Sequence, residues 1–270
     1  MICFPNAKIN LGLNIVSRRE DGYHNLETVF YPIPLCDALE VVSASGDRTT
    51  FTQTGIPVDG LPEDNLVMKA YSLFCQEAGQ DYKLDLYLRK HIPFGAGLGG
   101  GSADASFLLK LMNEYTDRGF TDDQLEAMAS RLGADCPFFI RNTPVYAEGT
   151  GNVFSPVAVS LKGYRLVLIK PDIHISTREA FSLIRPRRPE RSVKEIVQTP
   201  VAEWKDSLRN DFEESVFPQY PEIGAIKQDL YDRGAIYASM SGSGSSVFGL
   251  FDASFDGDLP DKAYQMKPEL

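Results

Sequence analysis

The chain has 270 residues, of which 43% are hydrophobic and 24% are charged, as is usual for a protein that folds around its own core. Its net charge of −10 and its pI near 4.9 argue against nucleic acid as the main partner, because duplex binding depends on a basic surface. No apolar run approaches the roughly 20 residues of a membrane helix, and the N-terminus lacks the pattern of a signal peptide, so we expect a cytoplasmic protein without a membrane partner.

The cysteines and histidines give no sign of a metal centre or a disulfide framework. None of the four cysteines belongs to a CxxC pair and their neighbours are apolar, so we expect free, buried thiols. The three histidines have no metal-ligand spacing. The four cysteines are Cys3, Cys36, Cys75 and Cys136.

The first predicted element is a strand with an unusual polar face. In the segment AKINLGLNI, from Ala7 to Ile15, the apolar residues alternate with the other residues, which is the period of a β-strand. Lys8 and Asn10 lie on the polar face, where we expect side chains that hold a ligand. The pair Asp21-Gly22 then predicts a tight turn.

The middle of the chain alternates between helical and strand patterns. Helical spacing of apolar residues predicts a helix over 63–79, and period-two alternation predicts a strand over 82–93 that leads into a glycine-rich loop. After the loop the helical spacing resumes. A capping box of Thr121 with Gln124 predicts a further helix that stops at Gly133, followed by a short apolar stretch.

The last third of the chain differs in composition. It predicts an apolar strand over 164–171, a basic and proline-broken exposed connection over 185–195, and a helix over 221–235. A strand, a loop of small residues and a second strand follow over 235–251. The irregular order of helices and strands, with hairpin-like pairs, favours an α+β chain in two parts over a doubly wound parallel sheet.

The glycine-rich loop PFGAGLGGGSADAS, Pro93–Ser106, has five glycines between Gly95 and Gly101. A helix N-terminus offers unpaired N–H groups and the positive end of the helix dipole, and glycines let the backbone approach an anion and adopt positive φ. Together these features predict a phosphate cradle. A Walker A loop needs a Lys-Ser/Thr pair after the glycines, and no such pair follows here. The pattern does not fit a dinucleotide fingerprint either. The positive charge at the transferred group must therefore come from elsewhere.

Three motifs in order resemble those of the GHMP kinases, the superfamily of galactokinase, homoserine, mevalonate and phosphomevalonate kinases. The glycine loop resembles the second motif, Ala7–Ile15 the first, and SMSGSGSSVFG at Ser239–Gly249 the third. The resemblance implies an α+β, two-domain GHMP kinase fold, with a ribosomal-S5-domain-2-like N-terminal part and a ferredoxin-like C-terminal part. It implies an ATP-binding domain over residues 1–155 and, over 156–270, a domain that completes the substrate site.

Further stretches resemble one branch of this superfamily, which acts in isoprenoid biosynthesis. They are Ala7–Phe30, GADCPFFI at Gly133–Ile140 and NDFE at Asn210–Glu213. The resemblance implies transfer of the ATP γ-phosphate to a hydroxyl of a cytidine diphosphate sugar alcohol, with ATP and Mg²⁺ as cofactors. The chain departs from the family at Asn152, where a glutamate often follows the AEG-x-G element.

Two charged residues are candidates for the chemistry. Phosphoryl transfer needs positive charge at the moving phosphoryl group and a group that orients or deprotonates the attacking hydroxyl. The resemblance implies that Lys8 steadies charge at the reacting oxygens, close to the catalytic acid, and that Asp135 is the general base, kept ionised by Lys8. From the sequence alone, Lys8 fits a surface lysine on an edge strand as well as a ligand-holding residue. Asp135 fits either a surface cap or a buried functional carboxylate.

The resemblance also implies contacts with the acceptor substrate. Tyr23 is expected to stack on the cytosine, His24 to bond its edge, and Phe181 to form the second wall of the sandwich. Thr177 is expected to place a hydroxyl near the substrate, and Asn10 joins this set from the polar face of the first strand. An aromatic clamp tolerates any base, so the hydrogen bonds near His24 must reject uracil.

The nucleotide contacts are expected from the loop and from one helix. Asn65 and Lys69 approach the adenine or its ribose. No carboxylate stands out for Mg²⁺, so we expect the ATP phosphates, Ser102 and water to hold it. The loop residues expected to contact ATP are Pro93, Phe94, Gly95, Ala96, Gly97, Leu98, Gly99, Gly100, Gly101, Ser102 and Ala103.

Two alternatives stay open at this point. The first is another GHMP kinase, of the homoserine or mevalonate type, whose small acceptor needs no aromatic clamp of Tyr23, His24 and Phe181. The second is a nucleotide-binding sensor that has lost catalysis, against which Lys8 and Asp135 argue. As an enzyme, the protein is expected to act on a small molecule as a monomer or weak homodimer.

Overall fold

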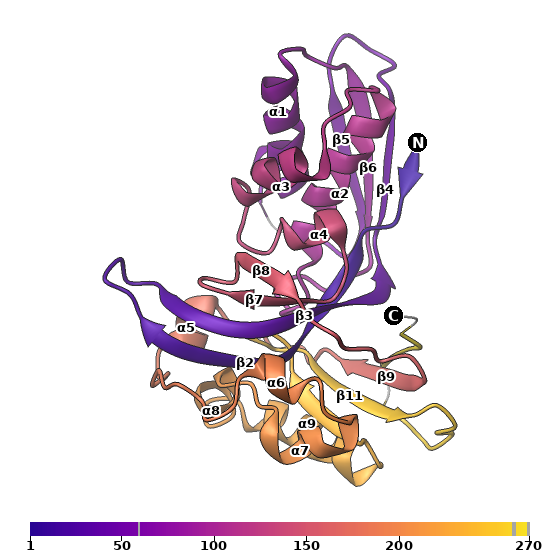
Figure 1. Ribbon diagram of the computed structural model, residues 1–270. Helices are drawn as coiled ribbons and strands as arrows, with labels where there is room; N and C mark the ends of the chain where they lie inside the picture. Colours follow the sequence, from indigo (N-terminus) through magenta and orange to yellow (C-terminus); the bar gives the residue numbers. More distant parts are fainter. Residues whose placement is uncertain (59, 261–262, 269–270) are drawn as a thin grey trace. The chain divides into compact units, whose positions relative to one another are not determined.

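The computed structural model describes residues 1–58, 60–260 and 263–268 (Figure 1). The chain forms two compact units, neither of which is continuous in sequence. The first unit contains Met1–Ala7, Leu35–Phe94 and Gly99–Thr143, and the second contains Lys8–Pro34, Gly95–Leu98 and Pro144–Leu270. The predicted domains, residues 1–155 and 156–270, are continuous in sequence and differ from these units. That domain division stays a prediction.

The first unit is built on a four-stranded sheet with the order β1-β4-β6-β5. β5 runs parallel to β6, whereas the other neighbours are antiparallel. Buried leucines alternate along the central strand, as the sequence pattern predicts. The strands are β1 (Ile2–Cys3), β4 (Ala38–Ser43), β5 (Thr50–Gly55) and β6 (Leu84–Lys90).

Helices cover one face of this sheet (Figure 1). The Asn65 side chain caps the first helix by accepting from Val67 N–H, and Gly79 ends it with a φ of 63°. The predicted capping box of Thr121 and Gln124 is confirmed. The apolar stretch after Gly133 forms a turn and a short helix. The helices are η1 (Pro62–Asp64), α1 (Leu66–Ala78), α2 (Gly100–Tyr115), α3 (Asp122–Ser130) and α4 (Phe138–Arg141).

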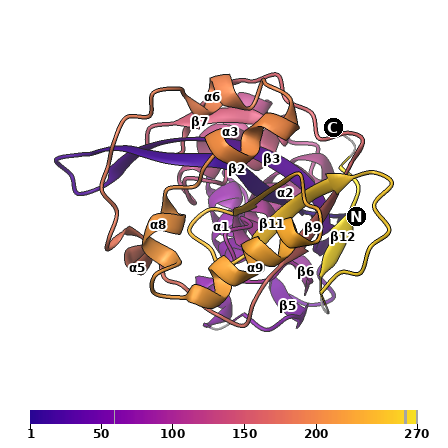
Figure 2. The ribbon, with the colours of Figure 1, turned by 90° about the horizontal axis from the view of Figure 1, so that it is seen from below.

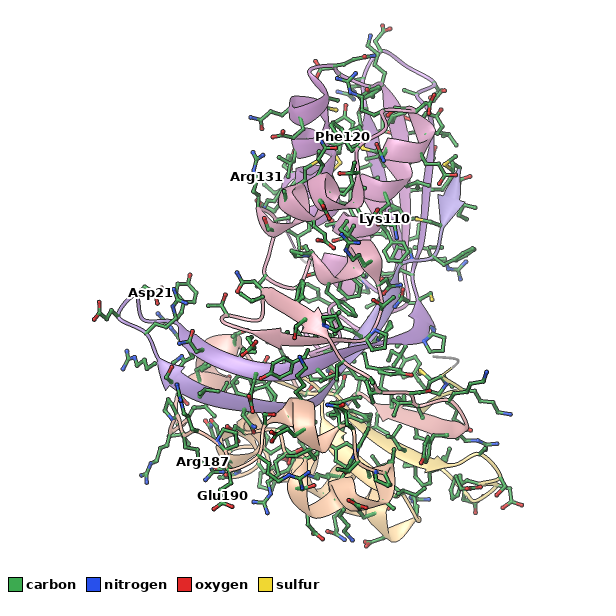
Figure 3. The ribbon with its side chains drawn as sticks, in the orientation of Figure 1. Asp21, Lys110, Phe120, Arg131, Arg187 and Glu190 are labelled. Atoms are coloured by element: carbon green, nitrogen blue, oxygen red, sulfur yellow. The ribbon has the colours of Figure 1, made fainter. Side chains whose placement is uncertain are left out.

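A second sheet, with the order β2-β3-β7-β8, belongs mostly to the second unit. The predicted first strand is confirmed, although both of its faces are buried from Ala7 to Ile15. Asp21 lies in the turn at the tip of the β2–β3 hairpin (Figure 3). The strands are β2 (Asn6–Arg18), β3 (His24–Cys36), β7 (Val145–Glu148) and β8 (Val153–Pro156).

The second unit contains another antiparallel sheet, with the order β10-β11-β9-β12. α9 lies beside β11 (Figure 2) and also contacts β10. Its Ile223 and Leu230 are buried in the core of this unit. The strands are β9 (Tyr164–Ile169), β10 (Tyr237–Met240), β11 (Val247–Asp252) and β12 (Tyr264–Met266). The helices are α5 (Thr177–Phe181), α6 (Val193–Ile196), η2 (Val201–Glu203), α7 (Trp204–Ser207), α8 (Phe212–Val216) and α9 (Pro221–Asp232).

Other expectations concern the thiols, the basic connection and the membrane. All four cysteines are free, Cys75 and Cys136 are buried, and Cys3 and Cys36 are partly buried. In the basic connection predicted over 185–195, residues 185–192 have no helix or strand and carry the exposed Arg187 (Figure 3). Residues 193–195 instead begin α6 with Val193 buried, so the prediction was wrong there, because the Ser192–Glu195 capping box starts a helix. Within the described residues, no helix is long and apolar enough to cross a membrane.

Candidate active site

The glycine loop enters α2 through a series of left-handed residues. Gly95, Gly97 and Gly99 have φ values of 59°, 75° and 70°, a region that other residues rarely adopt. The prediction that these glycines adopt positive φ is confirmed. The imidazole ring of His174 lies against Gly95, 2.8 Å from the position of a Cβ there, a contact that no local sequence pattern predicts.

The first turn of α2 is open to a ligand at Gly101. A Cβ on Gly101 would meet its nearest atom, Leu66 Cδ1, at 3.7 Å, so neither sterics nor φ requires a glycine here. Gly99 is the N-cap, and within the described chain no side chain caps this helix end. The first N–H groups of α2 therefore have no capping side chain, which leaves them available to bind an anion.

A cavity of about 400 Å³ in the first unit joins the loop to part of the predicted nucleotide site. Phe94, Gly101 and Asn65 all line it. Asn65 Nδ2 donates to Gln53 Oε1 at 3.2 Å, so its amide is already engaged at both ends. Lys69 lines a different cavity, of about 350 Å³. Asn65 thus lines the same cavity as the loop residues, whereas Lys69 lines a separate one.

A buried ion cluster lies at the same cavity and was missed from the sequence. Lys90 Nζ donates to Asp104 Oδ2 at 2.7 Å and also to Asp37 Oδ2, and all three side chains are at most 3% exposed. Burial raises the pKa of Asp104 to about 7, against the smaller opposing effect of the Lys90 charge. Two sequence features could have indicated this cluster: Lys90 lies near the end of a predicted strand, and Asp104 follows the glycines closely.

The raised pKa of Asp104 predicts a pH-dependent stability. The folded protein keeps a proton on Asp104 up to about pH 7, whereas the unfolded chain releases it near pH 4, so this contribution to stability is lost as pH rises between these values. The asparagine side chain of Asp104→Asn does not titrate, so the variant lacks this pH-dependent contribution. The unfolding free energy of the variant relative to the parent should therefore increase between about pH 5 and pH 8. Urea titrations measure it, and a constant difference would contradict the assignment.

Asp135 lies in the turn between α3 and α4, where it is half-buried. The next residue is tied to α2, because Ser106 Oγ donates to Cys136 O at 2.7 Å. The Ser102 hydroxyl, in the first turn of α2, also contacts the Cys136 thiol, whose pKa is raised to about 11 by burial. Within the first unit, the predicted base is therefore held next to the start of the helix that follows the glycines.

Lys8 is buried and its ammonium is held in the second unit. Its residue exposure is 3%, which excludes the interpretation as a surface lysine. Nζ donates to Asn10 Oδ1 at 2.7 Å and to Gly97 O at 3.3 Å, and it lies 4.8 Å from the centre of the Phe30 ring. The charge is thus fixed beside the glycine loop, although it lies 89 residues away in sequence.

Asn10 holds Lys8 and is itself held by β3. Its Nδ2 donates to Thr28 Oγ1 at 3.0 Å, and Thr28 Oγ1 donates in turn to Gly12 O at 2.5 Å. The Asn10 amide is 2% exposed and both of its ends have partners. The geometry gives Asn10 a role in orienting Lys8, and its predicted contact with substrate stays a prediction.

The loop of the third motif contacts the glycine loop within the second unit. Ser241 Oγ donates to Gly97 O at 2.9 Å, and a Cβ on Gly97 would lie only 2.0 Å from Ser241 O. Asn210, from the NDFE stretch, donates to Met240 O and Gly242 O at 2.8 Å each. Gly97 is therefore required by this contact between loops, independently of any ligand.

Ser241→Ala tests this contact. The substitution removes the bond to Gly97 O and leaves Asn10 N–H without its 3.3 Å acceptor, so we expect a loss of about 1–3 kcal/mol in unfolding free energy. Ser246→Ala is the matched control, because the Ser246 hydroxyl is also buried but has no partner among the described residues. Denaturant unfolding compares the two, and equal losses would show that the bonds of Ser241 contribute little.

The predicted base-binding residues are only partly brought together. The His24 ring stacks on the Phe181 ring, with centroids 4.6 Å apart and planes at 16°. Burial, with a smaller effect of the Arg18 charge, lowers the pKa of His24 and favours its neutral form. Tyr23 is 67% exposed, and Thr177 begins the helix that ends at Phe181. The stacked pair is observed, whereas the contacts of Tyr23 and Thr177 with substrate stay predictions.

Comparison with known proteins places this geometry in a family. The model for the GHMP kinases N terminal domain matches residues 65–142, and the model for the GHMP kinases C terminal region matches residues 192–266. A protein of Parabacteroides distasonis named 4-diphosphocytidyl-2-C-methyl-D-erythritol kinase is 62% identical over 252 residues, 93% of this chain and 92% of that protein. The chain belongs to the GHMP kinase family.

Two further relatives of this GHMP kinase agree with the assignment. A protein of the same name from Bacteroides fragilis strain NCTC 9343 is 63% identical over 253 residues, 93% of this chain and 92% of that protein. A crystal structure of a 4-(cytidine 5′-diphospho)-2C-methyl-D-erythritol kinase is 31% identical, with a TM-score of 0.82 over 99% of both chains. The predicted α+β GHMP kinase fold and membership of a family of ATP-dependent phosphotransferases are confirmed.

The described residues hold no dedicated metal site beside the predicted phosphate cradle. In the ranges that the structure describes, no three His, Cys, Asp or Glu side chains are placed to hold a metal ion. Ser102 stands in the first turn of α2, where a hydroxyl can reach an ion that arrives with a nucleotide.

Proposed function

We propose that this GHMP kinase transfers the γ-phosphoryl group of ATP to a hydroxyl of 4-diphosphocytidyl-2-C-methyl-D-erythritol, a step of non-mevalonate isoprenoid biosynthesis. The observation that carries the proposal is the identity of 62% and 63% with relatives named for that kinase activity, over 93% of the chain. The buried Lys8 and the open first turn of α2 supply the charge and the phosphate cradle that such a transfer needs.

The nucleotide is proposed to bind with its phosphates at the first turn of α2. Gly101 leaves room there, and the cavity lined by Phe94 and Asn65 takes the adenosine. Mg²⁺ enters as part of the MgATP substrate and is held by the phosphates, water and Ser102. Lys69 lines a separate cavity, which makes it the weakest member of the proposed nucleotide set.

The two charged residues are proposed to divide the chemistry between them. Asp135 accepts the proton of the attacking hydroxyl as general base. Lys8, fixed by Asn10 and Gly97, presents a positive charge to the reacting oxygens. Because the ammonium is already oriented by two acceptors, it needs no rearrangement at the moment of transfer.

The cytidine end of the acceptor is proposed to bind at the hairpin of β2 and β3. Tyr23 and Phe181 offer their faces to the cytosine, and the neutral His24 bonds its edge. Thr177 and Asn10 complete the proposed set. We further propose that the protein acts in the cytoplasm as a monomer or weak homodimer, with no nucleic-acid partner.

A direct assay tests this function. ADP release is measured with 4-diphosphocytidyl-2-C-methyl-D-erythritol, homoserine or mevalonate as the acceptor, each with ATP and Mg²⁺. Turnover is expected with the first acceptor alone. Turnover with homoserine or mevalonate alone would replace the proposal by another GHMP kinase activity, and ATP binding without turnover on any acceptor would favour a nucleotide-binding sensor.

A further inference from the structure

We propose that Asp37, Lys90 and Asp104 form a positioning cluster that orders the start of α2 for nucleotide binding. The proposal rests on the proposed use of this helix terminus by ATP and deepens it, because it names the residues that hold the terminus in place. All three residues belong to the first unit and are buried. None of them is needed for the chemistry assigned to Lys8 and Asp135.

Asp37 fixes the chain just before the glycine loop. Its Oδ1 accepts from His91 N–H at 2.5 Å and from Ile92 N–H at 2.8 Å, while its Oδ2 accepts from Lys90. A carboxylate that accepts three bonds is held in one orientation. The residues at the end of β6 are therefore clamped to the segment that precedes β4.

Lys90 extends this clamp across to α2. Its Nζ bridges Asp37 and Asp104, and Asp104 lies in the second turn of α2, on the far side of the loop in sequence. The same Nζ would be 3.3 Å from a Cβ on Gly100, the first residue of the helix. The contact between Lys90 and Asp104 thus lies beside the helix start, and it fixes the two ends of the loop that belong to this unit.

The cluster acts through position and not through contact with the nucleotide. Lys90 is shared between two carboxylates, so it is not a free cation for phosphate. Lys90 and Asp104 line the cavity, but both side chains are only 3% exposed and Asp104 Oδ1 has no exposed surface, so a nucleotide would reach them only after a rearrangement. What the cluster supplies is a fixed direction for the N–H groups of the first turn.

Calorimetric binding of a non-hydrolysable ATP analogue to three variants tests the proposal. Asp104→Ala removes the tie to Lys90 and should weaken the Kd about tenfold or more, because a small displacement of a preorganised site is costly. Asp104→Asn keeps an oxygen for Lys90 and should restore the Kd to within about threefold of the parent. Glu114→Ala, an exposed acid on the same helix, should leave the Kd unchanged.

Steady-state kinetics give the second readout. Asp104→Ala should raise the KM for ATP and leave the KM for the acceptor unchanged, with kcat within about threefold of the parent. A Kd equal to that of the parent, or no rescue by Asp104→Asn, would overturn the proposal. If Asp104→Ala does not fold, Asp104→Ser, whose hydroxyl is too short to reach Lys90, takes its place under the same criteria. Calorimetry needs no acceptor. Its result therefore does not depend on whether the proposed acceptor is correct.

Discussion

Replacing Asp135 with asparagine is expected to lower turnover by roughly 10²–10⁴-fold, the usual contribution of a general base, while the Kd for ATP stays unchanged. The change keeps the size of the side chain and removes only the proton acceptor. Ser106 and Ser102 hold the neighbouring Cys136, so the turn that carries the residue should keep its place beside α2. Single-turnover rates at saturating ATP and acceptor measure the effect.

The control for this variant is Asp81→Asn, an exposed acid of the same unit that removes the same charge. It should keep the rate and melting temperature of the parent. If Asp135→Asn retains turnover within a few fold of the parent, Asp135 is not the base. If it loses ATP binding as well, the residue shapes the nucleotide site instead of the proton transfer.

Lys8→Met is expected to lower turnover by about 10²–10³-fold, because it removes a preorganised charge from the reacting oxygens. Methionine has a similar length and tolerates the buried position, although Asn10 Oδ1 loses its donor. The loss of turnover should therefore be far larger than the change in the free energy of unfolding. Lys162→Met, an exposed lysine of the same unit, is the matched control. Turnover close to that of the parent would remove Lys8 from the chemistry.

Elements with a local signal could be predicted from the sequence. The alternation from Ala7 to Ile15, the cap at Thr121 and the glycine that ends α1 each act within a few residues, so pattern alone locates them. The strand β3 has no such signal. Its Pro32 and Pro34 are residues that the interior of a sheet rarely accepts, and only pairing with β7 and burial against the core identify it.

The contacts of the predicted site residues could not be predicted from the sequence. Burial of Lys8 and its bond to Gly97 depend on contacts over 89 residues, which no local pattern encodes. The same holds for the Asp37–Lys90–Asp104 cluster, whose first two members are 53 residues apart. The stacking of His24 on Phe181 likewise needs α5 to lie against the β2–β3 hairpin.

The glycines of the loop have different roles in the structure. In the sequence, the five glycines together predict phosphate binding. Gly97 and Gly100 instead have crowded neighbours, since a Cβ would lie 2.0 Å from Ser241 O and 2.9 Å from Ile92 Cγ2 respectively. Gly101 has no such need, so it and the uncapped helix start carry the case for a phosphate.

Phosphoryl transfer to the cytidine diphosphate acceptor can be followed with label from [γ-³²P]ATP. The purified protein is incubated with labelled MgATP and 4-diphosphocytidyl-2-C-methyl-D-erythritol, and the products are separated. We expect label in the acceptor in proportion to the ADP formed, and almost none with Asp135→Asn. Label found only in inorganic phosphate, or an acceptor that stays unlabelled while ATP binds, would contradict this transfer.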